Sequence, residues 1–207
     1  LFTKTEFPRA LLNSLMIAFL TTVCCLLISI LGSYAMTRLK YPGRRFFKTS
    51  IIFSYLIPTA VLFVPMYVFV SKLGFYDNKW ALLIIYPTTV VPYCCYMLMS
   101  YFKAIPYALE EAALIDGCTR MKSLRYIITP IALPGIAVVA TFAFTMSWNE
   151  YLYAMIMTTS PAQQTAVVAI SSFKYADSAI WGRIMAASVL TSLPVTIIYI
   201  VAQAQLI

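Results

Sequence analysis

The segment Pro106–Pro134, PYALEEAALIDGCTRMKSLRYIITPIALP, is polar and helix-forming, and it lies between two strongly apolar segments of the chain. It carries charges of both signs, which are Glu110, Glu111, Asp116, Arg120, Lys122 and Arg125. A polar segment between two membrane spans has to face water, where a protein partner can reach it. We therefore expect helices in this segment, with docking of a partner as their function.

The composition of the whole chain is typical of a membrane protein. Of its 207 residues, 62% are hydrophobic and 11% are charged, whereas soluble domains average about 25% charged residues. Apolar runs of about 20 residues recur, and each is long enough to cross roughly 30 Å of hydrocarbon. The chain is therefore predicted to be all-α, a polytopic membrane helix bundle in which residues 1–207 form a single domain.

Five membrane spans are expected, at about residues 10–35, 51–70, 80–102, 131–157 and 181–204. Residues 36–50 contain five basic and no acidic side chains, and the positive-inside rule places them in the cytoplasm. Counting spans from there places residues 103–130 in the cytoplasm and residues 158–180 outside, with a short helix near 165–173. An outside chain start without a signal sequence suggests a sixth span before Leu1.

Prolines are expected to interrupt two of these spans. Pro58 and Pro65 lie in the second span, and Pro87 and Pro92 lie in the third. Because proline removes a backbone donor, it kinks a helix. Such breaks are tolerated in a membrane where neighbouring groups or water satisfy the freed carbonyls.

The polar segment has the start and stop signals of two short helices. Pro106 suits a first helical position, and Gly117 suits the left-handed position that follows a helix end. A first helix over residues 107–116 is therefore expected. Thr119 can cap a second helix over residues 120–128, which Pro130 would end.

The spacing of this segment resembles a known signature. Glu111-Ala112-Ala113, three residues, Gly117, nine residues, Ile127 and then Pro130 are similar to the EAA loop of permease subunits in binding-protein-dependent ABC importers. Further stretches resemble the maltose-type carbohydrate permeases over most of the chain, including Ser147-Trp148-Asn149-Glu150-Tyr151. One departure is Thr129, which stands where the family usually has leucine.

The resemblance implies a type I importer permease with a cytoplasmic coupling loop at residues 103–130. The residues expected to contact or respond to the ATPase are Glu110, Glu111, Ala112, Ala113, Asp116 and Gly117. The implied partners are cytosolic ATP-binding subunits, a homologous second permease subunit, an extracytoplasmic solute-binding protein and membrane lipid. The resemblance implies no cofactor in this chain, with ATP and Mg on the ATPase, and a location in a bacterial or archaeal inner membrane.

A polar cluster in the fourth span is the candidate substrate pathway. Trp148, Asn149, Glu150 and Tyr151 offer an aromatic face and hydrogen-bond groups, which suit a sugar ring. A charged residue within a span commonly faces a cavity or a partner. A role in helix packing or at a subunit interface is the alternative for Glu150.

Several other functions are disfavoured by residues that the sequence lacks. It has no His, its five cysteines match no zinc spacing, and it has no GxxxxGK[ST] phosphate loop. These features argue against an enzyme or an ATPase, and the net charge of +8 follows from membrane topology rather than from nucleic-acid binding. The alternatives left open are an importer permease for another solute, such as a polyol phosphate or a peptide, and a stand-alone secondary transporter or channel.

Overall fold

The computed structural model describes residues 5–173 and 181–203, and within these residues the regular structure is helical, with no strand. The first half contains α1 (Phe7–Arg38), α2 (Arg44–Leu56), α3 (Thr59–Lys72), the 3₁₀ turn η1 (Lys79–Ala81) and α4 (Leu82–Ala104). The insert contains α5 (Tyr107–Ile115), α6 (Arg120–Ser123), the π-helical turn η2 (Leu124–Ile128) and α7 (Thr129–Ile131). The rest contains α8 (Leu133–Asn149), α9 (Leu152–Met157), α10 (Ala166–Ser172) and α11 (Trp181–Gln203).

The core lies where α1 packs against α4 and α8. Cys25, Cys94 and Val139 are fully buried there, and small side chains let the helix backbones approach closely, which is how helices associate in lipid. Ser33 adds a polar link, because its hydroxyl donates to the Cys95 carbonyl at 3.0 Å. Cys25, Cys94 and Cys95 thus pack as small buried side chains, whereas Cys24 and Cys118 are only partly buried.

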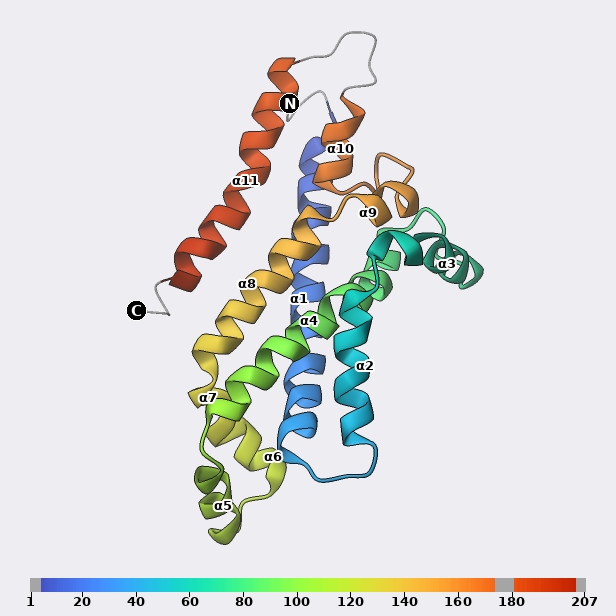
Figure 1. The fold of residues 1–207 in the computed structure, drawn as a ribbon. Coiled ribbons are helices and arrows are strands. Elements are labelled where there is room, and N and C mark those ends of the chain that lie inside the picture. The colour runs from blue at the N-terminus through green and yellow to red at the C-terminus, as the bar shows by residue number, and fades with distance from the viewer. Residues whose placement is uncertain (1–4, 174–180, 204–207) are drawn as a thin grey trace.

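α1 is a 32-residue helix, longer than the predicted first span. Its proline, Pro8, lies in the first turn, where a missing N–H costs no helical hydrogen bond. With no proline in its interior, the helix continues without a break along the length of the molecule (Figure 1).

The structure has the five predicted membrane spans only if each pair of helices joined by a sharp bend is counted as one span. Among the described residues, three helical segments are each long and apolar enough to cross a membrane, at Phe7–Arg38, Lys79–Ala104 and Trp181–Gln203. Two more candidates are bent pairs, with a 99° bend between α2 and α3 and an 81° bend between Arg120–Ile131 and Leu133–Asn149. The final residue of the predicted fifth span, Ala204, lies outside the described residues.

The second predicted span, residues 51–70, is interrupted at Pro58, as the sequence predicted. The chain leaves the helix at Ile57, which is extended at φ −72° and ψ 121°, and Pro58 follows at φ −59° and ψ 127°. A residue before proline disfavours the helical region, which explains the break at this position. Pro65, Pro87 and Pro92 remain inside their helices, so only one of the four predicted interruptions is a full break.

The fourth predicted span, residues 131–157, is wrong as a continuous helix. It bends at Ala132, and α8 ends at Asn149 because Glu150 adopts an extended backbone at ψ 124°. The Glu150 carboxylate then accepts the N–H groups of Tyr153 and Ala154 at 3.0 and 3.1 Å. These are free donors at the start of α9, so Glu150 starts a new helix instead of continuing the old one.

The two segments that the positive-inside rule assigns to the cytoplasm, residues 36–50 and 103–130, lie at the same end of the bundle (Figure 1). The connection between α1 and α2 and the helices α5 and α6 lie together at the lower end in Figure 1. The start of α1 lies with α10 at the upper end (Figure 1). α10 confirms the short helix expected near residues 165–173.

Candidate functional site: the polar insert and a membrane cavity

The polar insert, residues 103–130, is a helix, a glycine corner and a second helix. α5 ends with a pair of hydrogen bonds in which Cys118 N–H donates to the Ala113 carbonyl at 2.9 Å and Gly117 N–H donates to the Leu114 carbonyl at 3.2 Å. This is the Schellman arrangement, and it requires the positive φ of 85° that Gly117 adopts. The Thr119 hydroxyl then accepts the Lys122 N–H at 3.3 Å and caps α6. Both caps were predicted from the sequence.

The second helix of the insert differs from its prediction in one respect. Instead of ending at Pro130, the chain widens into the π turn η2 and continues through α7 to Ile131. The Thr129 N–H reaches back five residues to the Leu124 carbonyl. A wider turn accommodates a proline ring that would collide with the carbonyl four residues earlier.

The candidate coupling residues divide between an outer and an inner side of the insert. Glu111, Ala112, Asp116 and Gly117 are exposed, whereas Glu110 and Ala113 are buried. The insert also exposes three large apolar side chains, Leu109, Ile115 and Met121, which are 43%, 85% and 62% exposed. Exposed apolar side chains grouped among polar ones are typical of a protein-binding surface.

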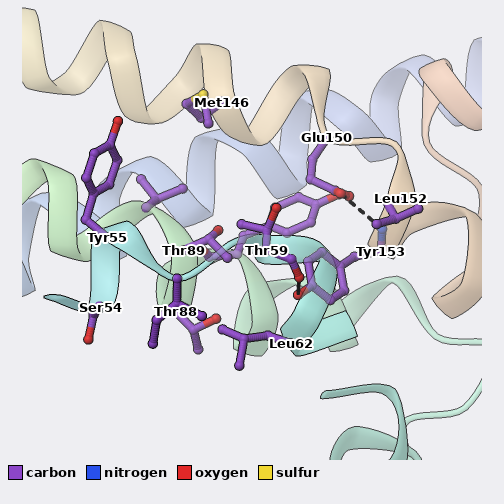
Figure 2. Close-up of a pocket in the computed structure, with 13 residues that line it drawn as sticks. Ser54, Tyr55, Thr59, Leu62, Thr88, Thr89, Met146, Glu150, Leu152 and Tyr153 are labelled. Atoms are coloured by element: carbon purple, nitrogen blue, oxygen red, sulfur yellow. Dashed lines mark hydrogen bonds between the residues drawn. The ribbon is translucent and has the colours of Figure 1, made fainter. Parts of the chain in front are cut away.

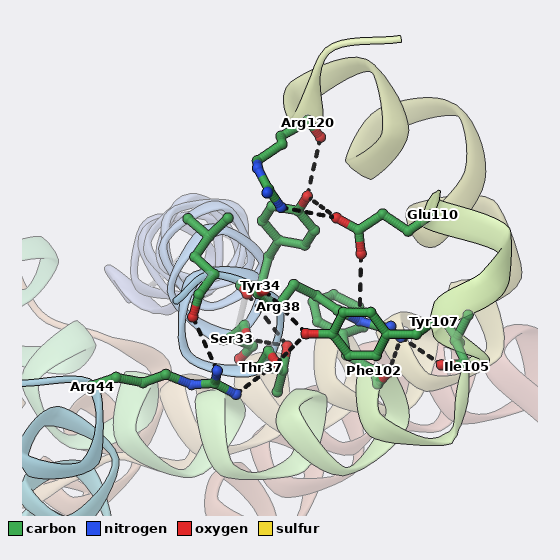
Figure 3. Close-up of polar contacts among 11 residues, drawn as sticks. Ser33, Tyr34, Thr37, Arg38, Arg44, Phe102, Ile105, Tyr107, Glu110 and Arg120 are labelled. Carbon is green, nitrogen blue, oxygen red and sulfur yellow. Dashed lines mark hydrogen bonds and ion pairs between the residues drawn. The ribbon is translucent and has the colours of Figure 1, made fainter. Parts of the chain in front are cut away.

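Glu110 faces inward, into a group of polar residues at the ends of α1 and α4 (Figure 3). Its carboxylate accepts a hydrogen bond from the Tyr34 hydroxyl at 2.5 Å and lies 3.8 Å from both Arg38 Nε and Arg120 Nη1. Arg38 is 2% exposed and donates to the carbonyls of Phe102 and Ile105 at 2.5 and 2.6 Å. Two buried opposite charges therefore face each other beneath the insert.

Tyr107 and Arg44 donate hydrogen bonds to the free carbonyls at the end of α1. The Tyr107 hydroxyl donates to the carbonyls of Thr37 and Arg38 at 3.1 and 3.0 Å, and the Arg38 guanidinium stacks 4.4 Å from the Tyr107 ring centre. Arg44 donates to three carbonyls at the end of α1, those of Met36, Thr37 and Leu39 (Figure 3). The ends of α1 and α4 are thus joined to α5 by polar contacts.

A cavity of about 190 Å³ lies beside the break between α2 and α3 (Figure 2). Its lining combines apolar side chains, Ile57, Leu62, Val90, Met146 and Leu152, with hydroxyl-bearing ones and one carboxylate, Ser54, Tyr55, Thr59, Tyr86, Thr88, Thr89, Tyr153 and Glu150. The Tyr153 hydroxyl donates to the Thr59 carbonyl at 3.1 Å, which satisfies a backbone group near the break. A mostly apolar lining with several hydroxyls and aromatic rings suits a ligand that offers both apolar faces and hydroxyl groups of its own.

The structure does not bring the four candidate pathway residues together. Glu150 lines the cavity. Trp148 is 2% exposed and stacks on Phe144 at 5.5 Å between ring centres. Asn149 is exposed and donates to its own helix at the Thr145 carbonyl, and Tyr151 packs at the edge of the core around Tyr86 and Tyr153.

Trp148 joins α8 to α11, because its Nε1 donates to the Thr191 carbonyl at 3.1 Å. Replacement with phenylalanine is expected to keep the stacking on Phe144 and to lose this hydrogen bond. We expect a loss of stability of about 1 kcal/mol with unchanged solute selectivity. Thermal unfolding in detergent and competition between labelled solutes measure the two effects, and a change of selectivity in W148F would instead place Trp148 in the solute path.

A second polar group lies near the start of α1, at the opposite end of the bundle from the insert (Figure 1). Asn13 Nδ2 donates to the carbonyls of Ala162 and Gln164 at 3.1 and 3.0 Å, and Lys79 Nζ donates to Asn13 Oδ1 at 2.8 Å. Nearby, Asp77 accepts hydrogen bonds from the Ser160 N–H and hydroxyl, which lower the pKa of the Asp77 carboxyl below its ordinary value. The start of α1 is thereby attached to the outer loops.

Sequence reasoning missed several residues of both sites. The sequence alone marks Arg38 only as a basic residue that reports topology, and it does not distinguish Tyr34, Tyr55 or Tyr86 from the other tyrosines. A basic residue at the very end of an apolar helix was a usable signal for Arg38, since it lies where helix carbonyls are free. The tyrosines gave no such signal, because the chain has fifteen of them.

Known proteins match this chain along most of its length. The family described as binding-protein-dependent transport system inner membrane component matches residues 28–206. An inner membrane ABC transporter permease protein of Escherichia coli (strain K12) is 37% identical over 92% of this chain and 68% of its own length. A trehalose/maltose transport system permease protein of Thermococcus litoralis is 34% identical, over 96% of this chain and 72% of its own length.

Solved structures share the fold. A bacterial ABC transporter involved in the import of the acidic polysaccharide alginate superposes with a TM-score of 0.85 at 22% identity, covering 98% of this chain and 76% of that one. The MetNI methionine ABC transporter superposes with a TM-score of 0.75 at 18% identity, covering 97% and 94%. At these identities the likeness concerns the fold.

Proposed function

Because the chain belongs to the family of inner membrane components of binding-protein-dependent transport systems, we propose that it is the permease subunit of an ATP-driven carbohydrate importer. It forms half of a translocation pathway through an inner membrane. The observation that carries the coupling part of this proposal is the shape of the insert. It is a capped two-helix projection with an exposed apolar tip at the basic end of the bundle.

The insert is suited to dock into a groove on a cytosolic ATPase. Leu109, Ile115 and Met121 supply apolar contact area, and the exposed carboxylates of Glu111 and Asp116 can pair with basic groups of the ATPase. ATP and Mg²⁺ bind to that partner and not to this chain. Closure of the ATPase then moves the insert, and through it the bundle.

The carbohydrate assignment rests on relatives and on the cavity. Relatives at 34% identity include the trehalose/maltose permease and a sulfoquinovosyl glycerol transport system permease protein of Agrobacterium fabrum. The cavity beside Pro58 offers hydroxyls and aromatic faces, which are the groups that bind sugar rings by hydrogen bonding and stacking. The Glu150 carboxylate lines one side of this cavity, which lies on the proposed sugar pathway.

The remaining partners follow from the family and from the exposed surfaces. A homologous second permease subunit completes the pathway, and an extracytoplasmic solute-binding protein delivers the sugar to the outer loops held by Asn13 and Asp77. Membrane lipid covers the apolar faces that neither subunit buries. Among these is the exposed face of α11, where Val189, Ile197 and Val201 are 62%, 58% and 58% exposed.

Reconstitution of the intact importer tests the function directly. The permease pair, ATPase and binding protein are placed in proteoliposomes with ATP on the ATPase side, and labelled oligosaccharides are supplied with the binding protein. We expect uptake that requires hydrolysable ATP and that unlabelled maltodextrins, trehalose or related sugars reduce. Competition by a polyol phosphate or a peptide instead would reassign the solute, and uptake without nucleotide would support a secondary transporter.

A further inference from the structure

We propose that Glu110 and Arg38 form a buried strut that transmits movement of the insert to α1, so that they are positioning residues for transport. The inference rests on the proposed coupling of this chain to an ATPase. The proposal gives the adjacent carboxylates of Glu110 and Glu111 different functions. Glu111 faces out toward the partner, whereas Glu110 faces in toward the bundle.

The burial of Glu110 is the first argument. The residue is 2% exposed, and in α5 the other buried residue is the small and apolar Ala113. Burying a carboxylate is costly unless an opposite charge and hydrogen bonds compensate it. Arg38 and Arg120 supply the charge, and the Tyr34 hydroxyl supplies a hydrogen bond at 2.5 Å.

The second argument is the number of elements that meet at Arg38. Its guanidinium lies 3.8 Å from Glu110 on α5 and binds the carbonyls of Phe102 and Ile105 at the end of α4. Arg38 is itself the last residue of α1. A single buried cation therefore holds the insert against two long helices (Figure 3).

The third argument is the path of the chain. The insert is covalently continuous with α4 on one side and with α7 and α8 on the other, so motion reaches these helices through the backbone. α1 lies far earlier in the sequence, and motion can reach it only through side-chain contacts. Glu110 contacts two residues of its last two turns, Tyr34 and Arg38.

Movement of the strut would reach the other end of the bundle through α1. α1 packs along α4 and α8, and near its other end Asn13 and Ser14 hold the outer loop at residues 162–166. A displacement of Arg38 is thereby conveyed to the loops that face the binding protein. Loss of the strut should uncouple hydrolysis from uptake rather than abolish either partner's binding.

Two isosteric variants of the reconstituted importer test the division of work, E110Q and E111Q. E110Q removes the buried negative charge, and we expect assembled complexes that hydrolyse ATP while sugar transported per ATP falls roughly tenfold or more, since a broken buried pair is costly. E111Q changes an exposed contact, and we expect weaker ATPase binding, with hydrolysis and uptake falling together at an unchanged ratio.

A double variant separates transmission from stability. Replacing both Glu110 and Arg38 with methionine removes the buried charges together, and such replacements commonly preserve or restore stability. We expect the double variant to melt above E110M, which leaves Arg38 as an unpaired buried charge, and to remain uncoupled. Normal sugar transport per ATP in this variant would overturn the strut, because the pair would then serve stability alone.

A milder variant, Y34F, covers the case in which the charge variants fail to assemble. It removes only the hydroxyl that donates to Glu110, and we expect a several-fold lower ratio of transport to hydrolysis. A Y34F complex as tightly coupled as wild type would refute the proposal. A wild-type complex without ATP-driven uptake would instead refute the proposed function, so the two failures are distinguishable.

Discussion

Replacing Gly117 with valine is expected to reduce ATP-driven uptake by about tenfold. Gly117 adopts φ +85° at the corner between α5 and α6, and a Cβ there would meet no atom within 4 Å. The cost is therefore one of backbone conformation, about 1–2 kcal/mol and more for a β-branched residue. Since 1.4 kcal/mol is a tenfold change in an equilibrium, the ratio of molecules with the corner to molecules without it would fall by about that factor.

Two comparison variants isolate this effect. G117N should be much milder, because asparagine tolerates the left-handed region. Gly74 has nearly the same φ, +83°, and equally open surroundings, but it lies at the end of α3 in a loop predicted to be outside. G74V therefore carries the same backbone strain away from the ATPase, and uptake equally impaired in G74V and G117V would refute a special role of the insert.

Replacing Gly135 with alanine is expected to destabilise the bundle by about 1–3 kcal/mol, the usual cost of overpacking. A Cβ on Gly135 would lie 2.5 and 2.7 Å from Cδ1 and Cδ2 of Tyr101, and closer still to Cγ. These ring atoms are near the α4 backbone, so they cannot move aside freely. The melting temperature of the purified protein in detergent should fall accordingly.

A substitution of Tyr101 tests whether its collision with the new Cβ causes the loss of stability in G135A. If the collision with Tyr101 is the cause, Y101A should relieve it, and the double variant G135A/Y101A should melt above G135A alone. G182A is the matched control, because a Cβ at Gly182 in α11 would meet nothing within 4 Å. Failure of Y101A to raise the melting temperature of G135A would contradict the close approach of α4 and α8 at this point.

The sequence predicts local features well where one residue decides them. Gly117 and Thr119 were identified as caps because a left-handed glycine and a side-chain acceptor have few substitutes at helix ends. The basic side chains of residues 36–50 predicted that this segment lies on the same side of the membrane as the insert, and the two lie at the same end of the bundle (Figure 1). Each of these predictions depends on neighbours within a few positions along the chain.

Features that depend on distant residues could not be predicted in the same way. Four prolines looked alike, yet only Pro58 breaks its span fully. The sequence does not distinguish Glu110 from Glu111 as coupling residues. Only Glu110 is buried, and its burial depends on Tyr34 and Arg38, more than seventy residues earlier. Trp148 and Glu150 were grouped by adjacency, whereas the end of α8 between them directs one to a helix contact and the other to a cavity.

The unbroken length of α1 has a mechanical consequence. At 1.5 Å per residue, its 32 residues measure about 48 Å. A stiff rod of that length acts as a lever, so a tilt of about 5° about its inner end would displace the outer end by about 4 Å. That is more than the length of a hydrogen bond, and it is enough to release or engage the contacts of Asn13 and Ser14 with the loop around Ala166.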